Sequence, residues 1–214
     1  LNKEQPHAFF FSFGSKERDE ITKVLPQYSS LYQDLSGTWA FHWVRTPEER
    51  PRDFFQPSYD VSRWDKVSVP MNWNVYGLQK DGRQKYGTPI YVNQQVIFWH
   101  QVKVDDWRGG VMRTPPKEWT TYRDRNEVGS YRRTFTIPKD WQGHGVYLNF
   151  DGVDSFFYLW INGHYVGFSK NSRSLASFDI SRYLRPEGEN VVAVEVYRNS
   201  DGSFLEAQDM FRLP

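Results

Sequence analysis

Apolar and polar residues alternate along several short runs of this chain, which is the period of a β-strand. In the run from Asn190 to Tyr197, Val192, Val194 and Val196 fall on one face, while the other face carries Glu195. Similar runs occupy residues 37–44, 64–70, 129–137 and 146–150. Strands that recur about every 8–12 residues, without a helical period over three turns, predict an all-β fold built as an antiparallel sandwich or barrel.

The most apolar stretch predicts a β-hairpin. Phe156 to Ile161 is an unbroken apolar and aromatic run, too short for a typical helix, so we expect a strand buried on both faces. Asn162-Gly163 follows directly, and both residue types tolerate the positive φ of a two-residue type I′ turn. His164 to Ser169 then returns as the second strand.

The remaining segments predict turns and loops. Thr46 followed by Pro47 predicts one helical turn with a threonine cap. Residues 72–93 carry strong turn signals, and residues 94–125 are weakly patterned. We expect residues 1–33 to form an irregular arm and residues 34–214 to form the folded domain. The arm is expected to be pinned to the domain surface by Phe9, Phe10, Phe11 and Phe13.

Composition excludes several functional classes. The chain has 214 residues, a net charge of +1 and no cysteine, so we expect neither a nucleic-acid binder nor a thiolate metal site or disulfide framework. No apolar run is long enough to span a membrane. Aromatic residues make up 18% of the chain, which suits both β-sheet cores and sugar-facing surfaces. The sequence does not determine the cellular compartment of the protein.

Several ordered blocks resemble a known family. Their residues are Gly37–Phe41 (GTWAF), Val69–Trp73 (VPMNW), Pro89–Asn93 (PIYVN), Asp151–Asn190, and Ser200–Arg212, which contains LEAQDMFR. Together these blocks resemble the N-terminal sugar-binding domain of family 2 glycoside hydrolases, and within that family the β-galactosidases. The resemblance extends, with gaps, over residues 34–214.

The resemblance implies a jelly-roll β-sandwich at the start of a larger enzyme. In the family, an immunoglobulin-like domain and a catalytic barrel follow, and two barrel glutamates hydrolyse the substrate, a β-galactoside. Glycoside hydrolysis needs such a carboxyl pair, so the chain alone is expected to be inactive. The complete enzyme is expected to be a homo-oligomer.

Two residues match family positions that contact substrate. Asn93 matches an asparagine that hydrogen-bonds the galactosyl ring, and its amide offers both a donor and an acceptor. Asp209 matches a carboxylate that reaches the galactosyl hydroxyls and helps to hold a monovalent cation, sodium. Without the resemblance, Asn93 is an ordinary loop residue and Asp209 a cap or surface acid. Asp201 and Glu206 are interpreted as structural.

The sequence also departs from the family pattern. Residues 78–86 resemble an insertion, and residues 94–127 are longer than in well-known members. Some members hold magnesium with a glutamine at the position of Lys170, a cation that offers no acceptor, so we predict no magnesium site in this domain even though Asp201 is present. Magnesium elsewhere in the enzyme stays open.

Other residues carry weaker functional hypotheses. We expect the aromatic side chains from Phe156 to Trp160 to be core, whereas Trp73 and Tyr76, in a predicted loop, are candidate platforms for sugar rings. The five histidines show no metal-ligand spacing and are expected to be structural or exposed.

Three readings of the function remain at this point. The first is a sugar-binding domain of a β-galactosidase, or of a family 2 β-glucuronidase or β-mannosidase. The second is a stand-alone carbohydrate-binding module without an attached enzyme. The third is a structural domain that mainly supports subunit assembly.

Overall fold

The computed structural model describes residues 10–17, 25–87 and 126–200. Its strands are β1 (Gly37–Val44), β2 (Asp65–Val69), β3 (Val128–Phe135), β4 (Tyr147–Phe150), β5 (Phe156–Ile161), β6 (His164–Ser169), β7 (Ala176–Asp179) and β8 (Asn190–Tyr197). One short helix, α1 (Trp73–Tyr76), and 3₁₀ turns at Pro26–Tyr28, Pro47–Glu49, Lys139–Trp141 and Ser181–Tyr183 complete these elements.

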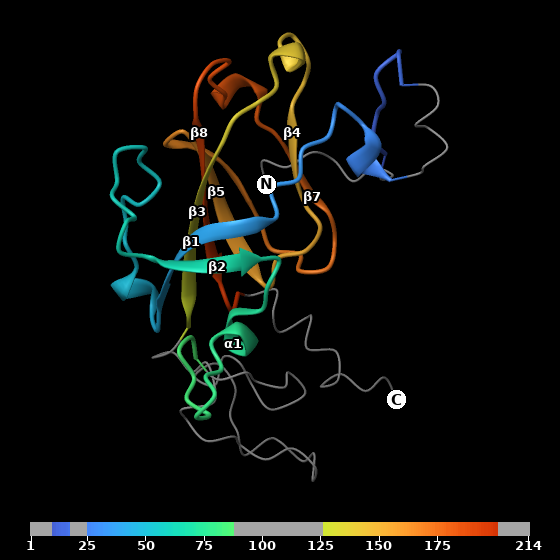
Figure 1. The fold of residues 1–214 in the computed structure, drawn as a ribbon. Coiled ribbons are helices and arrows are strands. Elements are labelled where there is room, and N and C mark those ends of the chain that lie inside the picture. The colour runs from blue at the N-terminus through green and yellow to red at the C-terminus, as the bar shows by residue number, and fades with distance from the viewer. Residues whose placement is uncertain (1–9, 18–24, 88–125, 201–214) are drawn as a thin grey trace, which may run out of the picture.

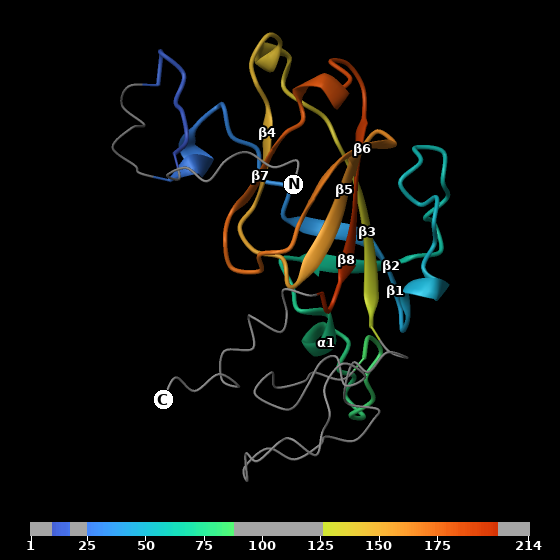
Figure 2. The ribbon, with the colours of Figure 1, turned by 180° about the vertical axis from the view of Figure 1, so that it is seen from behind.

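The strands form two antiparallel layers (Figure 1). The larger sheet has six strands in the order β2-β1-β3-β8-β5-β6, and β4 pairs with β7 in a smaller sheet of two strands. Seen from behind in Figure 2, β4 and β7 again lie to one side of the larger sheet. Strand β8 lies in the interior of the larger sheet, where it pairs with β3 on one side and with β5 on the other.

The core lies between the two layers. Alternate residues of the central strands point inward: Tyr131 of β3 is opposite Val194 of β8, which is opposite Leu159 of β5. Phe178 of β7 closes the core from the other layer and is fully buried. The period-2 pattern of the sequence therefore selects the side chains that fill the sandwich.

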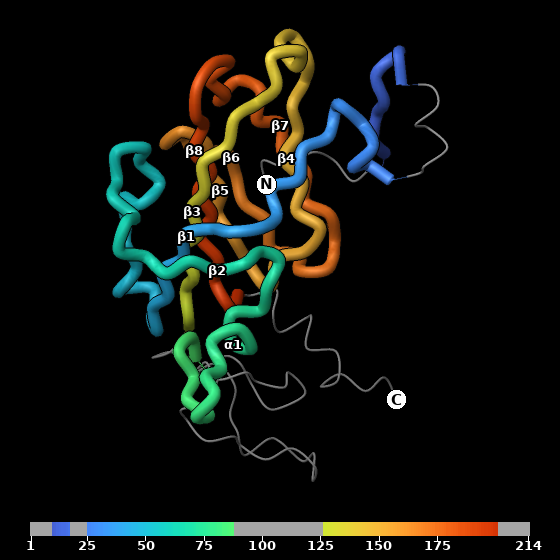
Figure 3. The backbone as a smooth tube through the Cα atoms, in the orientation of Figure 1, coloured from blue at the N-terminus to red at the C-terminus, as the bar shows by residue number. Residues whose placement is uncertain are grey.

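The opposite face of the large sheet is covered by the connection between β1 and β2. This connection, teal in Figure 3, lies on the side of the sheet away from β4 and β7. Arg132 of β3 holds it in place, because its guanidinium donates hydrogen bonds to the carbonyl oxygens of Phe54, Pro57 and Tyr59 at 3.1, 2.7 and 2.7 Å. Phe54, which belongs to this connection, is fully buried.

This cover changes which strand is buried on both faces. Every residue from Asn190 to Val196 of β8 is buried, and this includes Glu195. In β5, by contrast, only every second residue is buried, and Trp160 on the other face stacks on Phe55 with ring centroids 5.1 Å apart. The prediction that β5 is buried on both faces was therefore wrong, because β5 lies nearer the sheet edge than β8.

Several local predictions are confirmed. The hairpin turn has positive φ at Asn162 (51°) and Gly163 (87°), as a type I′ turn requires. Thr46 and Glu49 form a capping box around the turn at Pro47–Glu49. By contrast, the prediction of a loop from residue 72 was wrong at residues 73–76, which form α1; Asn72 caps this helix by accepting a hydrogen bond from the Asn74 amide at 3.1 Å.

The N-terminal arm is only partly as predicted. Phe11 and Phe13 are half-buried and their rings lie 5.5 Å apart, but Phe10 is 71% exposed and does not pin the arm by burial. Phe9 lies outside the described residues. Instead, polar contacts hold the arm, because the Trp141 indole N–H donates to the Ser30 carbonyl at 3.0 Å.

The all-β antiparallel sandwich is thus confirmed. Among the described residues, none of the helices has the length and apolar character needed to cross a bilayer.

Candidate functional site

Both predicted substrate contacts lie outside the described residues. Asn93 belongs to residues 88–125 and Asp209 to residues 201–214. The structure does describe the residues that flank these two segments: Gly87 before the first, Asn126 after it, and Ser200 before the second. The candidate site is therefore built from its flanks.

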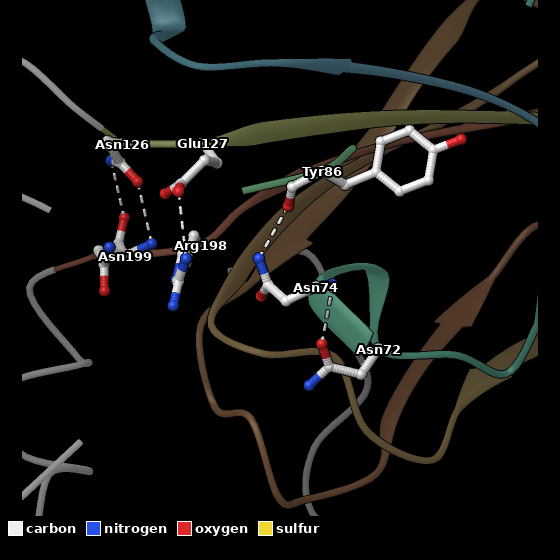
Figure 4. A network of polar contacts seen from close by, with 7 residues as sticks. All are labelled: Asn72, Asn74, Tyr86, Asn126, Glu127, Arg198 and Asn199. Carbon is white, nitrogen blue, oxygen red and sulfur yellow. Dashed lines mark hydrogen bonds and ion pairs between the residues drawn. The ribbon is translucent and has the colours of Figure 1, made fainter. Parts of the chain in front are cut away.

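The flank after residue 125 is joined to the flank before residue 201 (Figure 4). The Asn126 side chain donates from Nδ2 to the Asn199 carbonyl at 3.1 Å, and its Oδ1 accepts from the Asn199 amide at 3.0 Å. An antiparallel strand neighbour exchanges two hydrogen bonds in the same way. The side chain of Asn126 thus continues the β3–β8 ladder beyond its last pair, Val128 with Tyr197.

A buried ion pair lies directly beside this amide pair. Glu127 is fully buried, and its Oε1 accepts a hydrogen bond from Arg198 Nη1 at 3.1 Å. The backbone of the same two residues is joined as well, because the Arg198 amide donates to the Glu127 carbonyl at 3.0 Å. A buried charge is tolerated only where such a partner compensates it, so the pair fixes how these segments meet.

A second contact holds the start of the C-terminal segment. The Ser155 hydroxyl donates to the Ser200 hydroxyl at 3.1 Å, and the Ser155 amide donates to the Tyr197 carbonyl at 3.2 Å. Residues 197–200 are therefore held both by the chain after residue 125 and by the loop that precedes β5.

The flank before residue 88 is held by α1. Asn74 Nδ2 donates to the Tyr86 carbonyl at 2.8 Å, and Tyr86 itself is 4% exposed with its ring edge on Phe41, centroids 5.0 Å apart. A side chain added at Gly77 would come within 2.8 Å of the Tyr86 ring. Tyr86, seven positions before Asn93 in the sequence, is thus packed tightly.

Asp65 of β2 reinforces this flank. Asp65 accepts from Lys85 Nζ at 2.6 Å and from the Tyr86 hydroxyl at 2.8 Å. Burial, together with the hydrogen bond to Asp65, raises the pKa of Tyr86 to about 12. Burial also acts to raise the pKa of Asp65, but the hydrogen bonds from Lys85 and Tyr86 outweigh it, so this pKa lies below its ordinary value.

Trp73 is not a sugar platform. It is only 7% exposed and packs on Gly129, where an added Cβ would lie 2.6 Å from the Trp73 ring. Its ring also stacks on Phe41, with centroids 6.1 Å apart. Trp73 lies on α1 rather than in the predicted loop, and the helix directs its side chain into the core. Tyr76, on the same helix, is 49% exposed and stays available as a platform.

One hollow borders the start of α1 and the residues that follow β8. A cavity of about 1020 Å³ opens between the layers of the sandwich, and its lining includes Asn72, which caps α1, Trp73 and Asn74 of α1, and Arg198 and Asn199 after β8. Asp154, Ser172 and Arg173 add polar groups to the same lining. Amides, hydroxyls and charged groups of this kind can donate to and accept from the hydroxyls of a sugar.

The residues of this flank were not singled out from the sequence. Asn126 and Glu127 directly follow the weakly patterned residues 94–125, and their partners are 73 and 71 positions away. An asparagine or a buried glutamate gives no local signal for a partner so distant. The only local signal near these residues is the polar turn that begins directly after Arg198.

The described residues leave the cation prediction open. They contain no cluster of three or more His, Asp or Glu side chains that could hold a metal. Asp209, the predicted sodium ligand, and Asp201 lie outside the described residues. Lys170 is exposed at the end of β6. Burial lowers the pKa of His42, which stacks on Trp64 with ring centroids 5.3 Å apart.

Relatives of the chain are beta-galactosidases or a subunit of one. A beta-galactosidase of Priestia megaterium (strain DSM 319 / IMG 1521) is 39% identical over 213 residues, which cover 100% of this chain and 18% of the relative. One from Halalkalibacterium halodurans is 38% identical over 91% of this chain and 17% of the relative. The beta-galactosidase large subunit of Leuconostoc lactis is 34% identical over 86% and 28%. The chain thus spans less than a third of the length of these relatives.

Solved structures support the fold. A beta-glucuronidase from Bacteroides uniformis superposes with a TM-score of 0.51 at 20% identity, over 79% of this chain and 15% of that one. A glycosyl hydrolase family 2 member from Bacteroides cellulosilyticus DSM 14838 superposes with a TM-score of 0.50 at 20% identity, over 79% and 18%. The sandwich is therefore the jelly roll of these domains.

The model of the glycosyl hydrolases family 2 sugar binding domain matches residues 32–214. The chain accordingly belongs to glycoside hydrolase family 2, and it carries the sugar-binding domain of that family.

Proposed function

We propose that this chain is the N-terminal sugar-binding domain of a β-galactosidase, an enzyme that hydrolyses terminal β-D-galactose residues of β-galactosides. The observation that carries the proposal is the match to a beta-galactosidase across the whole chain at 39% identity. Glucuronidases superpose on the same fold, but at 20% identity that likeness concerns the fold alone.

The domain contributes binding rather than bond cleavage. Hydrolysis of a glycosidic bond needs two carboxyl groups on either side of the bond, and these are glutamates of a barrel domain that follows an immunoglobulin-like domain. Asn93 and Asp209 bind the galactosyl hydroxyls from this domain. The supporting geometry is that Arg198 and Asn199, which precede the segment of Asp209, line the same hollow as Asn74, whose side chain holds Tyr86. The complete enzyme assembles as a homo-oligomer.

A monovalent cation completes the pocket. Asp209 holds sodium, because a carboxylate is a hard oxygen ligand suited to such an ion. Activity of the complete enzyme should therefore rise as sodium replaces a bulky organic cation at constant ionic strength. An Asp209→Asn variant should need more sodium for half-maximal activity. An unchanged sodium requirement would contradict the proposal that Asp209 binds the ion.

A substrate panel tests the main proposal. The complete enzyme is assayed with nitrophenyl β-galactoside, β-glucuronide and β-mannoside, and we expect turnover of the galactoside to dominate. Preference for either other sugar would replace the proposal with that specificity. The chain alone should release no nitrophenol above background, since it lacks the carboxyl pair.

Calorimetric titration of the chain alone separates the domain from a free-standing module. Galactose and lactose should bind more weakly than millimolar, because the rest of the pocket comes from other domains. Millimolar or tighter binding would favour the module.

A further inference from the structure

The four residues Asn126, Glu127, Arg198 and Asn199 form a compact unit that we call the inter-segment tie. Its members come from two segments whose contacts span 71 and 73 positions of sequence. One half follows directly on the segment that carries Asn93, and the other half closely precedes the segment that carries Asp209.

The inter-segment tie adds contacts beyond those that pair β3 with β8. The β3–β8 ladder already joins these strands over eight residue pairs from Val128 to Phe135. Beyond that ladder, the side-chain amide of Asn126 makes two hydrogen bonds to the backbone of Asn199. Its own backbone amide donates to the Arg45 carbonyl at 3.2 Å, which anchors it to the end of β1.

Charge makes the arrangement selective. Glu127 has no exposed side-chain surface and Arg198 only 14%. A shift between the two segments would separate these two largely buried charges from each other, which is unfavourable. The ion pair therefore allows one relative placement of residues 126–127 and 198–199 and penalises others.

We infer that Asn126 and Glu127 are positioning residues for the sugar pocket, acting through Asn199 and Arg198. They fix the points from which the two substrate-binding segments depart. This inference rests on the function proposed above, because it concerns the pocket formed by Asn93 and Asp209. Since these two residues would bind the galactosyl ring before and during reaction, misplacing them should raise KM more than it lowers kcat.

The opposite end of β8 supplies a matched control. Asn190 is fully buried, and its Oδ1 accepts from Asn162 Nδ2 at 2.7 Å and from the Arg185 amide at 2.8 Å. An Asn190→Ala change therefore removes an amide network of the same kind, far along β8 from the tie.

The test compares variants of the complete enzyme with nitrophenyl β-galactoside. Asn126→Ala loses both bonds to Asn199, and we expect KM to rise about tenfold with kcat changed less than threefold, a loss typical of an unmade buried hydrogen bond. Asn126→Asp keeps the acceptor for the Asn199 amide and should recover part of the loss. Asn190→Ala should lower the melting temperature but leave KM within twofold.

Three results would overturn the inference. The first is an Asn126→Ala enzyme whose KM stays within twofold of wild type. The second is an equal rise of KM in Asn190→Ala, which would make the effect one of general stability. If Asn126→Ala does not fold, Asn126→Asp and Glu127→Gln decide by the same comparison, and wild-type KM in both would be the third. Lack of galactosidase activity in the wild-type enzyme would instead refute the proposed function.

Discussion

Both ends of strand β8 are held by hydrogen bonds of asparagine side chains, but the two ends are joined to different parts of the chain. At the end that begins with Asn190, two buried asparagine side chains bond to each other and to nearby backbone, and Asn162 lies in the tight turn between β5 and β6. At the other end, Asn126 bonds to the backbone of Asn199, and a buried ion pair is added.

The difference lies in what is joined. Asn162 and Asn190 are 28 positions apart and connect a hairpin to its neighbouring strand, which the sandwich needs for its own packing. The inter-segment tie connects residues 73 positions apart, and each of its halves borders a segment that carries a predicted sugar contact. One end of β8 therefore maintains the fold, and the other, in our account, also sets the site.

The largest effect is expected at the ion pair. Glu127→Ala removes the buried carboxylate that Arg198 contacts while Arg198 stays largely buried, so the free energy of unfolding of the chain should fall by about 3–5 kcal/mol. Asn190→Ala at the other end should cost less, about 1–3 kcal/mol. Urea unfolding followed by tryptophan fluorescence measures both.

A double variant sharpens this result. Glu127→Leu combined with Arg198→Met removes both charges, and replacement of a buried ion pair by apolar groups is often close to neutral. We therefore expect the double variant to be more stable than Glu127→Ala. Equal stabilities of the two variants would mean that the ion pair between Glu127 and Arg198 does not stabilise this end of β8.

The next effect concerns the packing beneath the site. Gly129→Ala would place a Cβ 2.6 Å from Trp73 and 2.8 Å from Phe41, and overpacking of this kind costs about 1–3 kcal/mol. Adding Trp73→Leu should restore part of the loss by making room. If Gly129→Ala unfolds at the wild-type urea concentration, the close contact between β3 and α1 is not rigid.

The smallest effect is electrostatic. The pKa of Asp65 lies below its ordinary value of 3.8, so its contacts stabilise the fold above that pH and are lost as the pH falls through the lowered pKa. Asp65→Asn should therefore reduce stability at pH 7, by less than about 1 kcal/mol because the pair is partly exposed. The deficit should shrink toward pH 3 in urea titrations, and a deficit independent of pH would remove the charge from the explanation.

Much of the fold could be predicted from local patterns. Alternation found β1, β3, β4 and β8, and Asn162-Gly163 found the hairpin, because each signal lies within one strand or one turn. What failed depended on tertiary contacts. Burial of both faces of β8 follows from a loop that Arg132 holds across the sheet, and burial of Trp73 follows from the space that Gly129 leaves.

The site divides in the same way. Asn93 and Asp209 could be proposed only through a family resemblance, since nothing in their local sequence separates them from loop residues. The tie could not be proposed at all, because a pairing across 73 positions has no local signature. The hydrogen bonds of Asn126 became visible only once β3 and β8 were placed side by side.

We propose above all that this domain lends Asp209 to the substrate pocket of a β-galactosidase. The most direct measurement is the KM of the complete enzyme for nitrophenyl β-galactoside after Asp209→Ala, with Asn190→Ala as the control for stability. We expect KM to rise at least about tenfold in Asp209→Ala, as for loss of a hydrogen bond to a charged group, and to stay within twofold in Asn190→Ala. A wild-type KM in Asp209→Ala would contradict the claim.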